Sequence, residues 1–190
     1  MKRILAVFIL SMLALLAGLA ACGSSSNMKE SSRKPNFNPG KNSATLVIIR
    51  ARPFPIVGPI SNYLDNRFIG ETTTKTYFST LVKPGLRYVI ADAENLTVIR
   101  MNFRAGRIYY LYQDISSGAW DKNSALSVLT RTEALKQMNG CEYIQYDNKK
   151  PGANLDAARY AQSVKEYHVK AKKNPDDYKP YLNYAGYAPK

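Results

Sequence analysis

The sequence predicts a mainly β fold: an antiparallel β-sandwich of six or seven strands followed by two C-terminal helices, α+β overall. Between residues 44 and 115, short runs of β-branched and aromatic residues alternate with Pro, Gly, Asn and Asp turn signals. After residue 129 the apolar residues recur at helical spacing instead. The length of 190 residues suits one such domain with small appendages.

The N-terminal segment, residues 1–21, is predicted to be a lipoprotein signal peptide. Lys2 and Arg3 precede an apolar run without charged residues that extends to Ala21. Leu19-Ala20-Ala21-Cys22 resembles the lipobox of bacterial lipoprotein precursors, in which small residues fit the peptidase and the cysteine is acylated with chains such as palmitate. We therefore expect cleavage between Ala21 and Cys22 and a lipid anchor on Cys22. The alternative is a retained membrane helix with an incidental cysteine.

The residue after the lipobox bears on localisation. Position 23 is Gly and not Asp, which, by resemblance to enterobacterial lipoproteins, lacks the inner-membrane retention signal and favours the outer membrane. Residues 22–43 contain Ser, Asn, Gly, Pro and Lys with almost no apolar residue. Such a segment cannot bury enough surface to offset its ordering entropy, so it is predicted to be a disordered tether.

The predicted sandwich domain covers residues 44–129. Its first strand, Ala44–Arg50, is a β-branched run typical of a buried strand, and the prolines that follow it interrupt the ladder. Lys83-Pro84-Gly85 favours a turn. The expected strand segments are 44–50, 62–65, 67–70, 75–81, 86–91, 96–103 and 107–113.

Residues 130–175 are predicted to be a helical extension packed on the sandwich. Thr130-x-x-Glu133 is a capping box and Gly140 suits a left-handed C-cap, which predicts a helix over 131–139. A second helix is expected after Asn154 as N-cap, with Asp156 in its first turn. Its apolar face would comprise Ala157, Tyr160, Ala161, Val164, Tyr167, His168 and Ala171.

Four segments together resemble the domain of unknown function 2846, which occurs in small bacterial lipoproteins and is similar to PEGA-type β-sandwich modules. These are Ala44–Arg50, Tyr77-Phe78, Lys83-Pro84-Gly85 and Arg104–Tyr110. The resemblance covers about residues 44–115 and implies a lipoprotein β-module of unassigned activity. The sequence departs from the pattern at Ala51-Arg52, an extra dipeptide before the proline.

The sequence shows no catalytic constellation, so the protein is predicted not to be an enzyme, with no cofactor and no metal. Glycine-rich phosphate loops, nucleophile elbows and His-Glu-x-x-His patterns are missing from the sequence. The remaining enzymatic hypothesis is a thiol or hydrolytic activity using Cys141 and His168. The simpler interpretation is that Cys141 is a small buried side chain and that His168 packs on the apolar face of its helix.

The tail, residues 176–190, carries Tyr178, Tyr181, Tyr184 and Tyr187 at every third position. In a polyproline-II segment these rings would lie on one side, whereas Pro180 and Gly186 disfavour an α-helix. The four tyrosines are therefore candidate ligand or partner contacts, for example with sugar rings. The alternative is that they pack back onto the domain.

The charge indicates the class of partner. A chain that begins at Cys22 has 25 basic minus 14 acidic residues, or +11. A basic surface attracts acidic polymers and lipid phosphates, so we expect a membrane contact and an envelope protein, peptidoglycan or lipopolysaccharide as partner, and no nucleic acid. The candidate surface residues are Arg50, Arg52, Arg67, Lys75, Lys149, Lys150, Lys172 and Lys173.

Overall fold

The computed structural model describes residues 27–33, 35–52, 58–93, 95–117 and 122–189. The predicted signal peptide, its cleavage site at Ala21 and Cys22, and the acylated Cys22 lie outside these ranges, so the expectations about them stay predictions. Within the described residues, none of the helices has the length and apolar character needed to cross a membrane.

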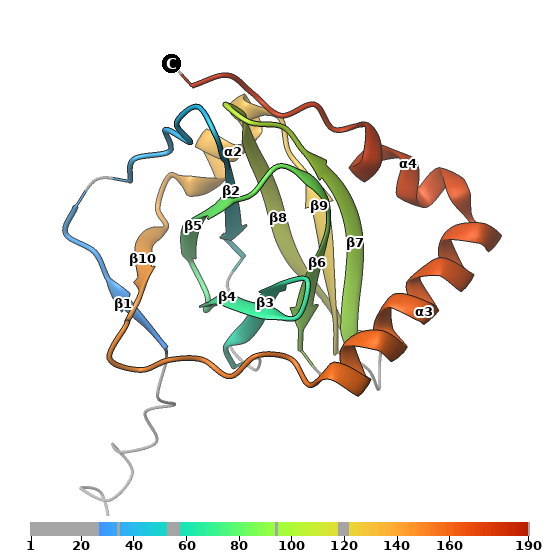
Figure 1. The fold of residues 1–190 in the computed structure, drawn as a ribbon. Helices are drawn as coiled ribbons and strands as arrows, with labels where there is room; N and C mark the ends of the chain where they lie inside the picture. The colour runs from blue at the N-terminus through green and yellow to red at the C-terminus, as the bar shows by residue number, and fades with distance from the viewer. Residues whose placement is uncertain (1–26, 34, 53–57, 94, 118–121, 190) are drawn as a thin grey trace, which may run out of the picture.

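In the described part of the chain, two β-sheets face each other and three helices lie around them (Figure 1). One sheet has six strands in the order β1-β10-β5-β2-β8-β9, and the other has four in the order β4-β3-β6-β7. The strands are β1 Met28–Glu30, β2 Ala44–Arg50, β3 Ile60–Leu64, β4 Arg67–Thr72, β5 Thr76–Val82, β6 Gly85–Asp92, β7 Leu96–Phe103, β8 Ile108–Ser117, β9 Lys122–Val128 and β10 Glu142–Tyr146. The helices are α2 Arg131–Met138, α3 Ala157–Lys173 and α4 Pro175–Asn183.

The predicted fold class is confirmed: the chain is mainly β and α+β overall. The described residues form more strands than the six or seven expected, and β1, β9 and β10 are the additions. The larger sheet is mixed, because β2 runs parallel to β8, and β10 runs parallel to β5.

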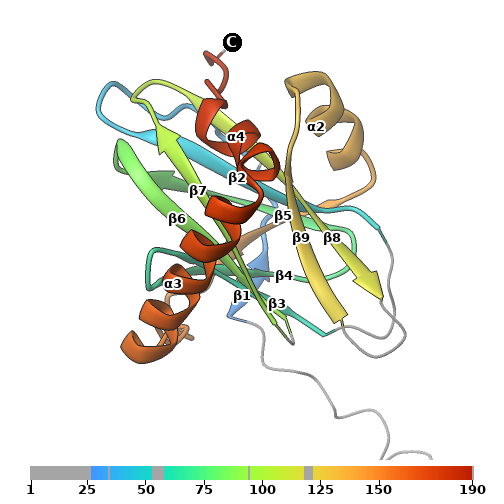
Figure 2. The same cartoon turned by 90° about the vertical axis from the view of Figure 1, so that its right-hand side faces the viewer.

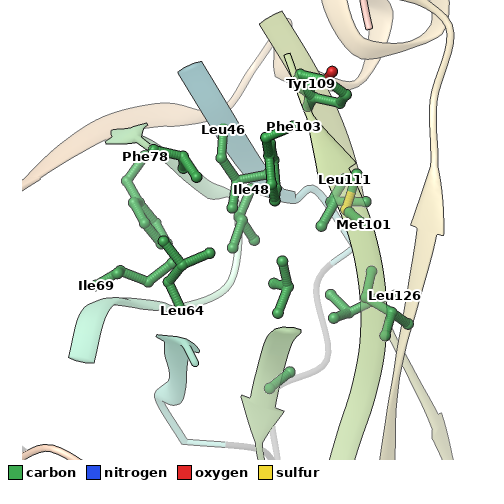
Figure 3. Close-up of a cluster of buried hydrophobic side chains, with 14 of the residues drawn as sticks. Leu46, Ile48, Leu64, Ile69, Phe78, Met101, Phe103, Tyr109, Leu111 and Leu126 are labelled. Carbon is green, nitrogen blue, oxygen red and sulfur yellow. The ribbon is translucent and has the colours of Figure 1, made fainter. Parts of the chain in front are cut away.

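The central strand β2 shows why both faces of the larger sheet are covered. All seven of its residues are buried. Leu46 and Ile48 point into the core between the sheets, where Figure 3 shows them with Phe78 and Phe103. Alternate residues point the other way and pack in the cluster beneath α2. A strand buried on both faces reads as a continuous apolar run, which is the pattern its sequence has.

Arg50 ends β2 inside the protein, so its predicted place on the basic surface is wrong. Its side chain is 1% exposed, and its guanidinium donates to the carbonyl oxygens of Gly58 and Thr72 at 3.0 Å each. The Thr72 hydroxyl in turn donates to the buried Gln113, whose amide donates to Asn62 at 3.1 Å. These residues form a hydrogen-bonded polar chain inside the sandwich, as buried polar groups require.

The capping box at Thr130 is confirmed as the start of α2. The Thr130 hydroxyl accepts from the Glu133 amide at 3.2 Å, and the Glu133 carboxylate accepts from the Thr130 amide at 2.8 Å. The N-cap of α3 differs from the prediction, because Asp156 accepts from the amides of residues 158 and 159. Asn154 accepts instead from the Phe68 amide of β4 at 3.1 Å.

The predicted tether, residues 22–43, differs from the structure over its described part. Met28 begins β1, which pairs antiparallel with β10, and its side chain is 8% exposed within the core. Further along, the Phe37 ring packs against Tyr110, and its carbonyl accepts from the Thr45 hydroxyl at 2.9 Å. Two anchoring apolar side chains and the free edge of β10 are enough to order a segment whose composition is polar.

The tail differs as well, because residues 175–183 form helix α4 and not an extended stripe. Pro175 begins the helix, where a proline removes no hydrogen bond, and Pro180 removes only one in so short an element. Contacts with the sandwich stabilise the helix, because Tyr181 and Tyr184 pack against the core. Tertiary contacts therefore outweigh the local preference that proline sets.

Candidate binding groove

A groove of about 680 Å³ lies where the edges of the two sheets meet α3 and α4. Its floor is formed by β7 from Leu96 to Ile99 and by Ala125 and Leu126 of β9. Figure 2 shows α3 and α4 running across β7, so that they form the outer wall. The groove therefore lies at a sandwich edge, on a part of the surface that the C-terminal helices shape.

Two side chains on the inner face of α3 seat that helix beside the groove. Ser163 and Tyr167 are each 5% exposed. The Tyr167 ring meets Tyr88 of β6 edge to face, with centroids 5.6 Å apart, and meets Tyr178 of α4 at 5.1 Å. Aromatic contacts of this geometry hold both helices against the four-stranded sheet.

One end of α3 is attached to the sheet by a bidentate ion pair. The Arg159 guanidinium donates to both carboxylate oxygens of Asp92 at 2.7 and 2.8 Å. The Asp92 side chain is 14% exposed, which strengthens the pair relative to a fully solvated one. Arg159 lines the groove with its charge already paired, so its role there is to position α3.

The remaining polar side chains of the groove have mixed character. Gln162 donates to the Glu166 carboxylate at 2.8 Å, and Lys170 and Asp177 complete the charged lining. Burial raises the pKa of Tyr178 further above physiological pH, where a tyrosine hydroxyl is already neutral at its usual pKa. The groove offers an aromatic face beside an amide, two carboxylates and one ammonium, a set suited to a polar and uncharged or zwitterionic ligand.

The structure separates the four tyrosines of the predicted stripe. Tyr178 and Tyr181 line the groove, and the Tyr181 hydroxyl donates to the Leu126 carbonyl at 2.6 Å. Tyr184 lies on Tyr109 of β8, with ring centroids 5.4 Å apart. Tyr187 forms a two-way backbone bridge with Ile108 at 2.7 and 2.8 Å. Tyr181, Tyr184 and Tyr187 therefore hold the tail on the strands, whereas Tyr178 packs on Tyr167 of α3 and lines the groove.

Cys141 and His168 lie on opposite sides of the sandwich. Cys141 follows α2 on the outer side of the six-stranded sheet, where its thiol donates to the Gln137 carbonyl at 3.2 Å. Burial raises its pKa, and Lys75 offsets this in part. His168 lies on α3, outside the four-stranded sheet, with Nε2 2.9 Å from the Tyr88 hydroxyl. The two therefore do not form a nucleophile and base pair.

The described residues contain no cluster of three or more His, Cys, Asp or Glu side chains that could hold a metal ion. The polar residues of the groove were not among the sequence-predicted candidates. The predicted apolar face of α3 included Ala157, Ala161 and His168, which are exposed, and omitted Ser163, which is buried. The spacing of Tyr160 and Tyr167 predicts which face of α3 packs on the sheet. No local pattern in the sequence predicts that β9 contributes to the same groove.

In the comparisons with known proteins, no family model, curated protein or solved structure matches the chain. The resemblance to the domain of unknown function 2846 therefore stays a prediction.

Proposed function

We propose that the protein is a non-enzymatic lipoprotein, held on the outer membrane by acyl chains on Cys22, whose β-sandwich binds a component of the cell envelope. The lipobox supports the anchor. The observation that carries the binding role is the groove, because it combines a concave shape with an aromatic face and several polar groups. The separation of Cys141 from His168 argues against the enzymatic alternative.

The leading ligand is a segment of an envelope protein. The groove lies at an open edge of both sheets, where Tyr178 presents an aromatic face and Glu166, Lys170 and Asp177 present charges of both signs. A peptide carries backbone amides and charged side chains that match such a lining. Binding would place the protein as an assembly module that holds its partner near the membrane.

The second candidate ligand is peptidoglycan or another envelope polysaccharide. Tyr178 beside Gln162 and Asp177 supports it, since sugar rings stack on aromatic faces and their hydroxyl groups pair with amides and carboxylates. Of the tail tyrosines, this version of the hypothesis uses Tyr178, because Tyr181 and Tyr184 are held in the domain by packing against the core and by their hydroxyl hydrogen bonds.

In-cell photocrosslinking tests the binding role. A photoreactive amino acid replaces Lys170 in the groove, and a matched variant carries it at Lys136 on α2, on the far side of the sandwich. We expect discrete adducts, to one envelope protein or to peptidoglycan fragments, from position 170 and not from position 136. The same adducts at both positions, or none at either, would contradict the proposal.

Two further measurements separate the parts of the proposal. Mass spectrometry of the mature N-terminus tests acylation of Cys22, and an uncut or unmodified terminus would remove the anchor. Co-sedimentation with purified cell-wall sacculi tests the polysaccharide ligand. Loss of binding in Tyr178→Ala would support the polysaccharide ligand, and retention of binding in that variant would place the polysaccharide contact away from Tyr178. No binding by the native chain would leave a protein partner as the ligand.

A further inference from the structure

The chain enters the folded domain at a fixed point. The Asn27 amide and side chain both donate to the Glu71 carboxylate, at 3.2 Å each. The Asn27 carbonyl accepts from the Asp147 amide at 2.9 Å, and β1 begins at the next residue. Figures 1 and 2 both place the start of β1 at the lower end of the sandwich as drawn, away from the C-terminus.

The distance from this point to the proposed lipid anchor is short. Five residue steps separate Cys22 from Asn27, and a fully extended chain covers about 18 Å in that length. A domain of this size is about 40 Å across. Because the reach is less than half of that width, an anchor on Cys22 keeps the end of the sandwich that carries Asn27 towards the bilayer.

This end of the sandwich is basic. Lys149 and Lys150 lie in the exposed turn after β10, and the Lys150 amide closes that turn on the Asp147 carbonyl at 2.9 Å. Lys29 of β1 lies beside the turn, with its side chain 58% exposed and its ammonium 3.6 Å from the Asp147 carboxylate. Arg67 is exposed at the start of β4.

The backbone of Arg67 lies close to the lysine turn, because the ring of the next residue, Phe68, packs near the end of β10. The Phe68 ring lies 5.9 Å from that of Tyr146, at the end of β10, and touches Gly152 in the following loop. Two of the nearby carboxylates are engaged: Glu71 by Asn27, and Asp147 by Lys29 and by the Lys149 amide at 3.2 Å. On β1, β4 and this turn the four cations therefore outnumber the three carboxylates, of which Glu30 is exposed.

We propose that Lys29, Arg67, Lys149 and Lys150 form a membrane-facing surface that binds the anionic headgroups of phospholipids. The inference rests on the proposed anchor at Cys22, which brings this end of the domain to the bilayer. Headgroup phosphates attract clustered lysine and arginine side chains within a Debye length, about 8 Å at physiological salt. The groove between β7, β9, α3 and α4 then lies on the flank of the anchored domain, open to a ligand.

Vesicle binding by a chain without acyl groups tests the surface directly. The protein used is residues 22–190 with Cys22→Ser, which retains every described element. The probes are vesicles of phosphatidylcholine with and without phosphatidylglycerol. We expect binding only to the anionic vesicles, weakening as salt rises. Each lysine near such a surface contributes about fivefold to affinity, so Lys149→Gln with Lys150→Gln should reduce binding about 25-fold.

The matched control changes the same charge elsewhere. Lys172→Gln with Lys173→Gln, at the C-terminal end of α3, removes two exposed lysines that lie outside the proposed surface. This control should bind like the starting protein. An equal loss in both double variants would show that net charge alone drives binding, and equal binding to both kinds of vesicle would overturn the proposal.

A second experiment uses the lipidated protein in nanodiscs. Cys141→Ser removes the other thiol, so that a single fluorophore can be attached to one introduced cysteine. We expect strong energy transfer to a membrane dye from Asn148→Cys, beside the lysine turn, and weak transfer from Lys136→Cys on α2. The reverse order would overturn the orientation. If Cys22 proves to be unmodified, the anchor fails in mass spectrometry while the vesicle arm still tests the surface, so the two failures are distinguishable.

Discussion

The Tyr184 side chain closes the end of the β8–β9 ladder through Tyr110. Its hydroxyl accepts a hydrogen bond from the Tyr110 amide at 3.2 Å and donates one to the Leu129 carbonyl at 2.6 Å. The registered pairing of the two strands begins next to these groups, at Leu111 and Val128. Burial raises the pKa of Tyr184 well above its usual value, so the hydroxyl keeps its proton and donates throughout the physiological range.

Tyr184→Phe should therefore destabilise the domain while keeping the ring contacts. The change leaves the Tyr110 amide and the Leu129 carbonyl without their bond, which costs about 1–3 kcal/mol. Urea unfolding at neutral pH measures this loss of unfolding free energy. Tyr178→Phe is the control, since the Tyr178 ring lines the groove and packs on Tyr167. An equal loss in both variants would contradict the role assigned to the Tyr184 hydroxyl.

Gly186 sets the path of the tail after Tyr184. Its φ is +65°, and a Cβ there would lie 2.9 Å from the Tyr109 ring and 3.0 Å from the Ile108 carbonyl oxygen. Gly186→Ala should cost roughly 2–4 kcal/mol from backbone strain and overlap together. Gly106→Ala is a matched control, because φ is +70° with no atom within 4 Å of its Cβ, and it should cost only about 1 kcal/mol.

Unfolding free energies of the two alanine variants give the comparison. A cost for Gly186→Ala no greater than for Gly106→Ala would show that the tail shifts away from β8 without loss, and that the bridge between Ile108 and Tyr187 contributes little.

The sequence predicts those parts of the fold whose signals are local. The buried run of β2 and the capping box at Thr130 each depend on residues close in the chain, and both are confirmed. Met28 and Tyr181 illustrate the opposite case. Met28 is one apolar side chain in a polar segment, and Tyr181 is one of four regularly spaced tyrosines, but each is ordered by a strand distant in sequence. The binding groove depends on such contacts, so spacing identified Tyr178 and Tyr181 but not the strand positions and polar residues that line the groove with them.

The buried pair of Thr72 and Gln113 allows a double-mutant cycle. The Thr72 hydroxyl donates to the Gln113 side chain, and both residues are fully buried. Gln113→Leu leaves the Thr72 hydroxyl and the Asn62 side-chain oxygen without this partner, so it should cost about 2–4 kcal/mol. Thr72→Val in the Gln113→Leu background should lower the unfolding free energy by less than Thr72→Val made alone, because the Gln113 side chain that bonds the Thr72 hydroxyl is already absent. Additive unfolding free energies would contradict this coupling.

Cys141 should react slowly as a free thiol. Because burial raises its pKa, little thiolate is present at neutral pH, and its side chain is only partly accessible. We expect alkylation by iodoacetamide at pH 7 to be slower than that of a cysteine in the unfolded protein. Any envelope phenotype should survive Cys141→Ser. Fast alkylation of the folded protein would restore the thiol hypothesis.

The capping box of α2 predicts a pH-dependent contribution to stability. Hydrogen bonds from the hydroxyl and the amide of Thr130 lower the pKa of Glu133 below its usual value of 4.5. A carboxyl group with a lowered pKa stabilises the folded state above its unfolded pKa, and this contribution is lost as the pH falls through the folded pKa.

Glu133→Gln keeps the shape of the side chain and removes the charge. Urea midpoints should therefore favour the native chain over Glu133→Gln at pH 7, and the difference should shrink below pH 4.5. Thr130→Ala, which removes the hydroxyl cap itself, should cost about 1 kcal/mol at pH 7. Because the other carboxylates titrate equally in the native chain and in Glu133→Gln, a difference that stays constant with pH would show that the Glu133 charge does not stabilise the helix.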